Sequence, residues 1–245
     1  MPSHGRVRTD DAGTDGDRRV TPPLVVDIDG TLTGPDRGID PRTMPVLKEW
    51  AAPVVVATGK AFPYPVGLCE FLAIPIRVIA ENGGVSYVAE TETVVFTGEP
   101  VAAQAVAEEY QAAGYDLGWG NADMVNRWRE TELAVSLDSP LEPLESIAAD
   151  HGLEVVDTGF AYHVKSPAQN KGTGLHAVAR ELDLDAEDFV AVGDSENDVS
   201  TFEAAGRAIA VANADDRALS AADEVTDGEY GEGFLEAAER IGRDA

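Results

Sequence analysis

Short apolar runs that alternate with helical patterns constrain the fold of this chain most. From Pro22 onward, runs of strand length rich in Val, Ile and Ala are followed by segments with helical periodicity. The predicted strands are 24–27, 54–57, 76–79, 189–192 and 208–211, and the predicted helices are 41–50, 65–73, 171–182, 198–205, 215–222 and 231–241. Strands that are apolar on both faces and joined by helices are typical of a doubly wound parallel α/β sheet. Ligands of such a sheet bind at the carboxyl ends of its strands.

Residues 84–164 interrupt this alternation. They contain a predicted hairpin of strands 85–88 and 93–96. Three further strands are predicted at 133–137, 153–156 and 161–164, and two helices at 101–113 and 141–151. Strands that follow strands indicate a small α+β domain with an antiparallel sheet. We therefore expect a core of residues 21–83 plus 165–245, with 84–164 inserted as a cap over the strand ends. Residues 1–20 have no apolar periodicity and are predicted to be a disordered extension.

Two pairs of aspartates follow predicted strands. Asp27 and Asp29 lie two residues apart, so strand geometry points both side chains to one side, about 7 Å apart. Asp194 follows an apolar strand and Asp198 lies near the next helix, so this pair can converge on a hard cation such as magnesium. Each pair alone has a simpler interpretation, because Asp-Gly is commonly a turn and Ser195-x-x-Asp198 fits a capping box. The presence of both pairs favours catalysis.

The composition is strongly acidic, with 45 Asp and Glu against 18 Lys and Arg, a net charge of −27 and only four lysines. Such a surface repels nucleic acid and anionic membranes. The same charges would repel one another in dilute buffer, whereas about 1 M salt shortens the screening length to ~3 Å. The composition therefore resembles that of proteins from salt-accumulating archaea, with a merely acidic cytosolic protein as the alternative. No membrane span or signal peptide is predicted, so we expect a cytoplasmic protein. The single cysteine, Cys69, has apolar neighbours and is predicted to be buried rather than catalytic.

Four segments resemble the motifs of the haloacid dehalogenase superfamily of phosphatases. They are Asp27-Ile28-Asp29-Gly30-Thr31, Ala57-Thr58-Gly59, Asn170-Lys171-Gly172 and Gly193-Asp194-x-x-Asn197-Asp198. The first and fourth are highly specific, and the resemblance spans residues 24–245. The insertion, preceded by Glu81-Asn82-Gly83-Gly84, resembles the cap of the branch that holds sucrose-phosphate, mannosyl-3-phosphoglycerate and archaeal phosphoglycolate phosphatases. Its compact size and the stretches 55–60 and 162–167 are most similar to the last of these.

The resemblance implies roles for the four aspartates. Asp27 would attack phosphorus and form an aspartyl-phosphate, which divides one hard step into two easier ones. Asp29 would protonate the leaving oxygen and then activate the water that clears the intermediate. Mg²⁺ would bridge Asp27, the backbone carbonyl of Asp29, and Asp194, with Asp198 as a direct ligand or an outer partner.

Two further motifs supply phosphate contacts. Thr58 can donate its hydroxyl to a phosphoryl oxygen, helped by backbone N–H groups around Gly59, although a threonine that only ends a strand is the alternative. Lys171 opens a predicted helix, where a cation is electrostatically unfavourable. This placement favours a lysine that binds phosphate and holds Asp27, against the alternative of a solvent-exposed side chain.

Other polar residues are less informative. For Lys60 and Lys165, a surface role and a substrate role are equally consistent with the sequence. Arg127 and Arg129 lie in the predicted cap, in an expected strand before Leu133, and a guanidinium there could pair with a substrate carboxylate. An ordinary surface pair is the more common outcome. Residues expected to have structural roles, in a cap strand and in the metal loop, are His163, Ser195 and Asn197.

The leading functional hypothesis is a Mg²⁺-dependent phosphatase of a small phosphorylated acid, with 2-phosphoglycolate first, which yields glycolate and phosphate. A phosphatase of a small sugar phosphate is the second. A non-hydrolytic phosphate-binding or phosphotransfer module is the third, and Asp29 argues against it, because related cation pumps that keep their aspartyl-phosphate have threonine there. The sequence leaves open whether the chain is a monomer or a homodimer.

Overall fold

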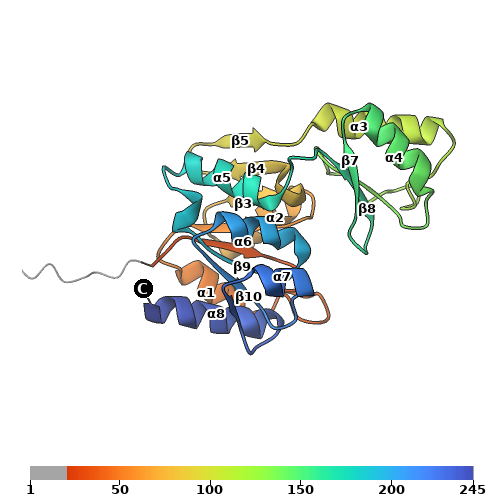
Figure 1. Cartoon of the computed structure of the whole chain (residues 1–245). Coiled ribbons are helices and arrows are strands. Elements are labelled where there is room, and N and C mark those ends of the chain that lie inside the picture. The colour runs from red at the N-terminus through yellow and green to blue at the C-terminus, as the bar shows by residue number, and fades with distance from the viewer. Residues whose placement is uncertain (1–20, 245) are drawn as a thin grey trace, which may run out of the picture.

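The computed structural model describes residues 21–244, and it has two parts, a large α/β core and a smaller α+β cap (Figure 1). The predicted disordered extension, residues 1–20, lies outside the described residues. Within the described part, no helix is both long and apolar enough to cross a membrane. The two parts are joined by the chain segments around residues 97–99 and 166–170.

An eight-stranded sheet forms the centre of the core, in the order β11-β10-β9-β1-β2-β3-β4-β5. Its six parallel strands are β1 (Leu24–Asp27), β2 (Val54–Ala57), β3 (Arg77–Ala80), β9 (Val190–Gly193), β10 (Arg207–Ala210) and β11 (Glu224–Val225). β1 lies in the middle of the sheet, between β2 and β9, so the ends of these three strands meet at one edge. The predicted parallel sheet is confirmed.

Helices cover both faces of this sheet, because successive strand residues point to opposite sides. Leu24 and Val26 pack on α1 (Thr43–Glu49), α2 (Pro63–Leu72) and α8 (Tyr230–Asp244). Val25 points to the other face, which is covered by α5 (Lys171–Glu181), α6 (Val199–Ala204) and α7 (Asp216–Ala221). Cys69 of α2 is fully buried, as predicted.

The predicted boundary of the insertion at residue 84 is wrong for its first hairpin. β4 (Val85–Val88) pairs antiparallel with β3, and β5 (Thr93–Phe96) pairs with β4, so both strands extend the core sheet. The physical reason is backbone pairing: β3 would otherwise expose an unpaired edge, which the hairpin covers. The small separate sheet begins only after this hairpin.

The cap consists of α3 (Pro100–Ala112), α4 (Leu141–Asp150) and an antiparallel sheet in the order β6-β8-β7. These strands are β6 (Leu133–Val135), β7 (Glu154–Asp157) and β8 (Tyr162–Lys165). One face of the sheet, with Leu133 and Val164, packs on Tyr110 of α3 and Leu144 of α4. His163 alternates with Val164 along β8 and therefore points to the opposite face.

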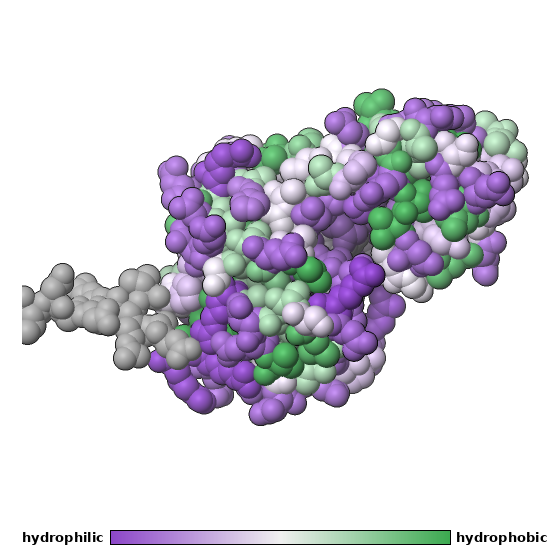
Figure 2. Space-filling model, viewed as in Figure 1, coloured by the Kyte–Doolittle hydropathy of each residue, from purple (hydrophilic) through white to green (hydrophobic). Residues whose placement is uncertain are grey.

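A hollow separates core and cap on the face shown in Figure 2, and hydrophilic side chains gather around it. The two connections between the parts lie together: the Thr97 hydroxyl donates to the Gly83 carbonyl, and the Gln169 amide donates to the Glu81 carbonyl at 2.6 Å. The short 3₁₀ turn Glu81–Gly83 therefore anchors both segments.

Candidate active site

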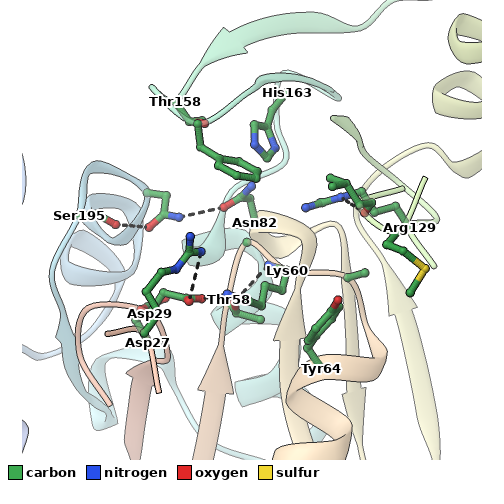
Figure 3. Close-up of a pocket in the computed structure, with 17 residues that line it drawn as sticks. Asp27, Asp29, Thr58, Lys60, Tyr64, Asn82, Arg129, Thr158, His163 and Ser195 are labelled. Carbon is green, nitrogen blue, oxygen red and sulfur yellow. Dashed lines mark hydrogen bonds and ion pairs between the residues drawn. The ribbon is translucent and has the colours of Figure 1, made fainter. Parts of the chain in front are cut away.

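The carboxyl ends of β1, β2 and β9 form the floor of a cavity of about 420 Å³ that the cap covers from above. Figure 3 shows Asp27, Asp29, Thr58 and Lys60 on the core side of this cavity, with His163 and other cap residues across from them. The site therefore lies where the parallel sheet predicted it, at the ends of adjacent strands.

The two aspartates after β1 have different surroundings. Asp27, the last residue of β1, is 5% exposed, whereas the Asp29 side chain is 37% exposed and faces the cavity. Asp29 Oδ2 accepts a hydrogen bond from the Lys60 ammonium, and Arg37 Nη2 lies 4.0 Å from Asp29 Oδ1. One carboxylate is thus fixed and buried, and the other remains open to a ligand.

Lys171 is completely buried at the start of α5, so the alternative of a solvent-exposed lysine is wrong. Asn170 caps this helix by accepting from the Thr173 backbone N–H at 2.9 Å, which fixes where Lys171 begins. The Lys171 ammonium donates to Asp27 Oδ1 at 2.6 Å and Asp198 Oδ1 at 2.7 Å. It makes a third hydrogen bond, at 3.0 Å, to the side-chain oxygen of Asn197. A buried cation is tolerated only when paired in this way.

Three carboxylates surround this lysine. Asp27, Asp194 and Asp198 each place an oxygen within 4.8 Å of the others. Asp198 Oδ2 accepts from the backbone N–H groups of Asp194 and Ser195, both at 3.1 Å, and its Oδ1 is held by Lys171. By contrast, Asp27 Oδ2 and Asp194 Oδ1 are buried and have no hydrogen-bond partner among the described residues. Orphaned anionic oxygens at this spacing fit a divalent cation with oxygen ligands.

Two glycines make room for these carboxylates. Gly30 has a positive φ of 83°, and a Cβ built on it would lie 1.9 Å from Asp194 Oδ2. A Cβ on Gly193 would lie 2.5 Å from the carboxyl carbon of Asp198. Because neither position tolerates a side chain, the backbone itself forms the wall behind the carboxylates.

Burial and mutual repulsion shift the pKa values of this cluster. Burial, together with the charges of Asp198 and Asp194, raises the pKa of Asp27 well above its usual value despite Lys171. Burial and the charge of Asp198 raise the pKa of Asp194 to about 7. Burial alone would lower the pKa of Lys171, but Asp198 and Asp27 outweigh it and raise that pKa. Excess negative charge in the cluster is what a bound cation would neutralise.

The end of β2 supplies the opposite side of the floor. Thr58 is 1% exposed, and its hydroxyl accepts from the backbone N–H of Lys60 at 3.1 Å, which leaves the hydroxyl proton to donate into the cavity. Gly59 lines the cavity, and a Cβ there would lie 2.9 Å from Asn82 Oδ1. The structure therefore brings Thr58, Gly59 and Lys60 to the site with Asp27.

The cap side of the cavity is more apolar. Its lining residues are Met124, Val125, Arg129, Thr158, Phe160 and His163. The Arg129 side chain is 7% exposed, and its Nη1 lies 3.4 Å from the fully buried carboxylate of Glu132. Burial, with the charges of Arg129 and Lys165, lowers the pKa of His163 to about 3, so its neutral ring donates from Nδ1 to Glu132.

Two of the remaining candidates, Arg127 and Lys165, lie outside the cavity. Arg127 is exposed and lines a different hollow on the cap. It lies in a turn and Arg129 directly follows that turn, so the expected strand before Leu133 is wrong. The loop needs these turns because Asn126 bonds both backbone groups of Ala134 and thereby folds the chain back on β6. Lys165 binds Glu154 at 2.8 Å and the Gln169 carbonyl at 2.9 Å, outside the cavity.

Asn82 is the main residue lining the cavity to which the sequence assigned no role. Its Nδ2 donates to both Glu132 oxygens at 3.1 Å, and its Oδ1 accepts from Asn197 Nδ2 at 3.1 Å. Asn197 in turn accepts from Lys171, so one chain of hydrogen bonds runs from the cap to the buried lysine. Asn82 adopts a left-handed φ of 52°, which Asn tolerates well and which the Asn-Gly pair in the sequence could have indicated.

Asn213 and Asp215 also support the site without a sequence pattern that marks them. Asn213 Nδ2 donates to the Gly30 carbonyl at 3.0 Å, which holds the turn after β1. Asp215 Oδ2 accepts from the Glu196 backbone N–H at 2.6 Å and fixes the 3₁₀ turn Glu196–Asp198. Asn213 and Gly30 are 183 residues apart and Asp215 and Glu196 are 19 apart, and the folded structure brings each pair together.

Comparison with known proteins gives the site its context. Residues 147–237 match the family model of haloacid dehalogenase-like hydrolases. The chain is 62% identical over 218 residues to a phosphoglycolate phosphatase of Natronomonas pharaonis, covering 89% of this chain and 96% of that protein. It is 61% identical over 217 residues to a phosphoglycolate phosphatase of Haloarcula marismortui, with the same coverage. Such halophilic relatives agree with the predicted salt adaptation.

Solved structures confirm the architecture. A Thermoplasma acidophilum protein matches with a TM-score of 0.77 at 23% identity, over 90% of this chain and 98% of that one. A haloacid dehalogenase-like hydrolase from Bacteroides thetaiotaomicron matches with a TM-score of 0.73 at 21% identity, over 91% and 100% of the two chains. The extent of the sequence identity to the phosphoglycolate phosphatases assigns the family: this chain belongs to the haloacid dehalogenase-like hydrolases, together with those enzymes.

Proposed function

We propose that the protein hydrolyses 2-phosphoglycolate to glycolate and phosphate through an aspartyl-phosphate on Asp27. The observation that carries the proposal is the buried Asp27, held by Lys171 through one oxygen and free at the other, in a cavity that also contains Asp29. Relatives with 62% and 61% identity carry the name phosphoglycolate phosphatase. The reaction needs a nucleophile, an acid and concentrated positive charge, and each has a candidate group here.

In this mechanism, Asp27 Oδ2 attacks phosphorus while Lys171 holds Oδ1 and thereby orients the nucleophile. Thr58 donates its hydroxyl to a phosphoryl oxygen, and the backbone around Gly59 lets that oxygen approach closely. Asp29 faces the cavity and protonates the leaving oxygen of glycolate. The same carboxylate then takes a proton from the water that hydrolyses the aspartyl-phosphate.

The donor set fits Mg²⁺, which prefers oxygen ligands and usually keeps several waters. Asp27 and Asp194, with their orphaned oxygens, would hold it together with the backbone carbonyl of Asp29. Asp198 has both oxygens engaged, which supports an outer role that orients Lys171 and the Asp194 loop. When bound, the cation neutralises charge on the transferred phosphoryl group.

The cap supports a small leaving group over a sugar. Its cavity wall offers the apolar side chains of Met124, Val125 and Phe160, and Thr158 is the one hydroxyl among the described cap residues that line the cavity. Recognition of a sugar requires several hydroxyl-binding groups, and half of the cap residues that line this wall are apolar. Location in the cytoplasm and a monomeric or homodimeric state stay predictions.

The test is phosphate release in high KCl from phosphoglycolate, sugar phosphates, nucleotides and an aryl phosphate, with Mg²⁺ and with EDTA. We expect Mg²⁺-dependent release, fastest from phosphoglycolate. Asp27→Asn should lose at least about 10⁴-fold in kcat, as nucleophile removal does elsewhere, and keep its fold. Asp150→Asn, an exposed site at the end of α4, is the matched control and should retain full activity. Substantial turnover by Asp27→Asn would refute the nucleophile assignment.

A further inference from the structure

We propose that Lys60 binds the carboxylate of the substrate and so selects phosphoglycolate over phosphomonoesters that lack a carboxylate. This inference rests on the proposed function and assigns the specificity of the same site to one side chain. Lys60 is one of only four lysines in the chain, and it lines the catalytic cavity.

The position of Lys60 follows from the segment after β2. Its backbone N–H donates to the Thr58 hydroxyl at 3.1 Å, and its carbonyl accepts from the Glu81 N–H at 3.0 Å. These contacts tie Lys60 to the phosphate-binding turn on one side and to the anchor of the cap on the other. The side chain is 32% exposed and reaches Asp29 Oδ2 with its ammonium group (Figure 3).

The contact with Asp29 places Lys60 on the leaving-group side of the site. A general acid must lie about 3 Å from the oxygen that it protonates. In phosphoglycolate the carboxyl carbon is two bonds from that oxygen, a separation of about 2.5 Å for bonds near 1.5 Å. A cation that touches the acid is therefore within hydrogen-bond reach of the substrate carboxylate.

Lys60 also has donors to spare. An ammonium carries three N–H groups, and among the described residues the Lys60 side chain makes one hydrogen bond, to Asp29. The carboxylate adds negative charge to a cavity that already contains Asp27 and Asp29. Without a cation beside it, that charge would be repelled, and Met124, Val125 and Phe160 of the cap wall give it no compensation.

The other cations of the cavity are less suited to this role. Lys171 uses all three donors on Asp27, Asp198 and Asn197. Arg129 forms an ion pair with the buried Glu132 carboxylate at 3.4 Å and lies on the cap side of the cavity, across from Asp29 (Figure 3). Arg37 is 72% exposed, so water screens its interactions.

The test compares phosphoglycolate with 2-hydroxyethyl phosphate, an analogue of similar size in which a neutral hydroxymethyl group replaces the carboxylate. The measured quantity is the ratio of kcat/KM for the two substrates, in high KCl with Mg²⁺. We expect the wild type to prefer phosphoglycolate and Lys60→Met to reduce that preference by about tenfold to a hundredfold, the range for a hydrogen bond between charged groups. Lys60→Arg keeps the charge and should keep most of the preference.

Two matched variants complete the design. Lys48→Met removes an exposed lysine of α1, outside the cavity, and should leave the ratio unchanged. Arg37→Met removes the exposed cation near Asp29 and should change the ratio much less than Lys60→Met. A larger loss of preference in Arg37→Met would overturn the assignment to Lys60.

Other outcomes separate this inference from the proposed function. If Lys60→Met slows both substrates by the same factor, Lys60 positions Asp29 and does not read the carboxylate, so the inference fails while the phosphatase assignment stands. The same conclusion follows if the wild type hydrolyses both substrates equally well. A wild type that hydrolyses neither overturns the proposed function and this inference together.

Discussion

The two walls of the cavity differ in how firmly their side chains are held. On the core side, Asp27 and Lys171 are almost fully buried, bonded to each other, and carried by the end of a central strand and the capped start of a helix. On the cap side, Met124 and Phe160 are each 53% exposed and lie in turns between the elements. The buried Asp27–Lys171 pair is thus fixed, whereas these two apolar side chains of the cap are free to adapt.

This difference assigns separate tasks to the two walls. Phosphoryl transfer needs groups held within a fraction of an ångström, and packing at strand ends supplies that rigidity. Selection of a leaving group tolerates looser contacts, and loops on a separate domain can change without disturbing the chemistry. Substitutions in the core wall should therefore cost far more than substitutions in the cap wall.

Lys171→Met is the most severe way to test the rigid wall. The change leaves Asp27 and Asp198 buried without their cation, so we expect a loss of about 3–5 kcal/mol in the free energy of unfolding. Activity should fall at least about 10³-fold, because Asp27, the proposed nucleophile, loses the group that orients it. Chemical denaturation and phosphate release measure the two effects.

Lys48→Met serves as the control for Lys171→Met, since it removes an exposed lysine and should change neither quantity. If both variants unfold at the same denaturant concentration as the wild type, the buried cluster contributes nothing to stability. The contrast between the two walls would then be wrong.

The response of stability to pH sharpens the comparison. Because the folded pKa of Asp194 is about 7, well above the value of about 4 in an unfolded chain, its ionisation costs more in the folded state. Without metal, protonated Asp194 therefore contributes its full stabilisation of the fold below about pH 4. This contribution is lost as the pH rises from about 4 to about 7. Thermal unfolding in EDTA and high KCl should show a midpoint that falls across this window.

Mg²⁺ and the Asp194→Asn variant provide the controls for this titration. A cation binds the ionised cluster, so the rise in melting temperature on adding Mg²⁺ should grow with pH through the same window. Asp194→Asn cannot ionise and should show a flatter curve in EDTA. A wild-type curve in EDTA as flat as that of the variant would contradict the proposed role of this carboxylate.

Phe160→Ala tests the adaptable wall and has the smallest expected effect. Because Phe160 is half exposed, stacks on Trp119 and lines the cap side of the cavity, we expect a change of only a few-fold in KM for phosphoglycolate. The variant should accept bulkier phosphomonoesters better than the wild type does, since space is opened. A loss as large as that of Lys171→Met would mean that the cap also fixes the chemistry.

The sequence predicted the parts of the molecule that depend on local patterns. Alternating strands and helices identified the sheet, and the spacing of the four aspartates predicted a site at one edge of it, where the structure brings Asp27, Asp194 and Asp198 together. The β4–β5 hairpin was assigned to the cap because periodicity identifies a strand but does not identify its partner. Strand pairing depends on which edges the rest of the fold leaves open.

The contacts that the sequence could not reveal are long-range polar ones. Asn82 bonds Glu132, 50 residues away, and Asn197, 115 residues away, and no spacing rule connects them. Lys60 illustrates the same limit in another way. Its sequence context left a surface role and a substrate role open, and only the folded chain places it against Asp29.

The closeness of the two connections between core and cap has a consequence for how such proteins can change. Thr97 on the outgoing segment and Gln169 on the returning one both bond the turn Glu81–Gly83, so the cap leaves and re-enters the core at one point. A domain whose ends lie together can be exchanged as a unit without breaking the host sheet. The cap can thus be replaced as one unit. Recombination at these two segments would join a different cap to the same core and so change the substrate without changing the residues of the core wall.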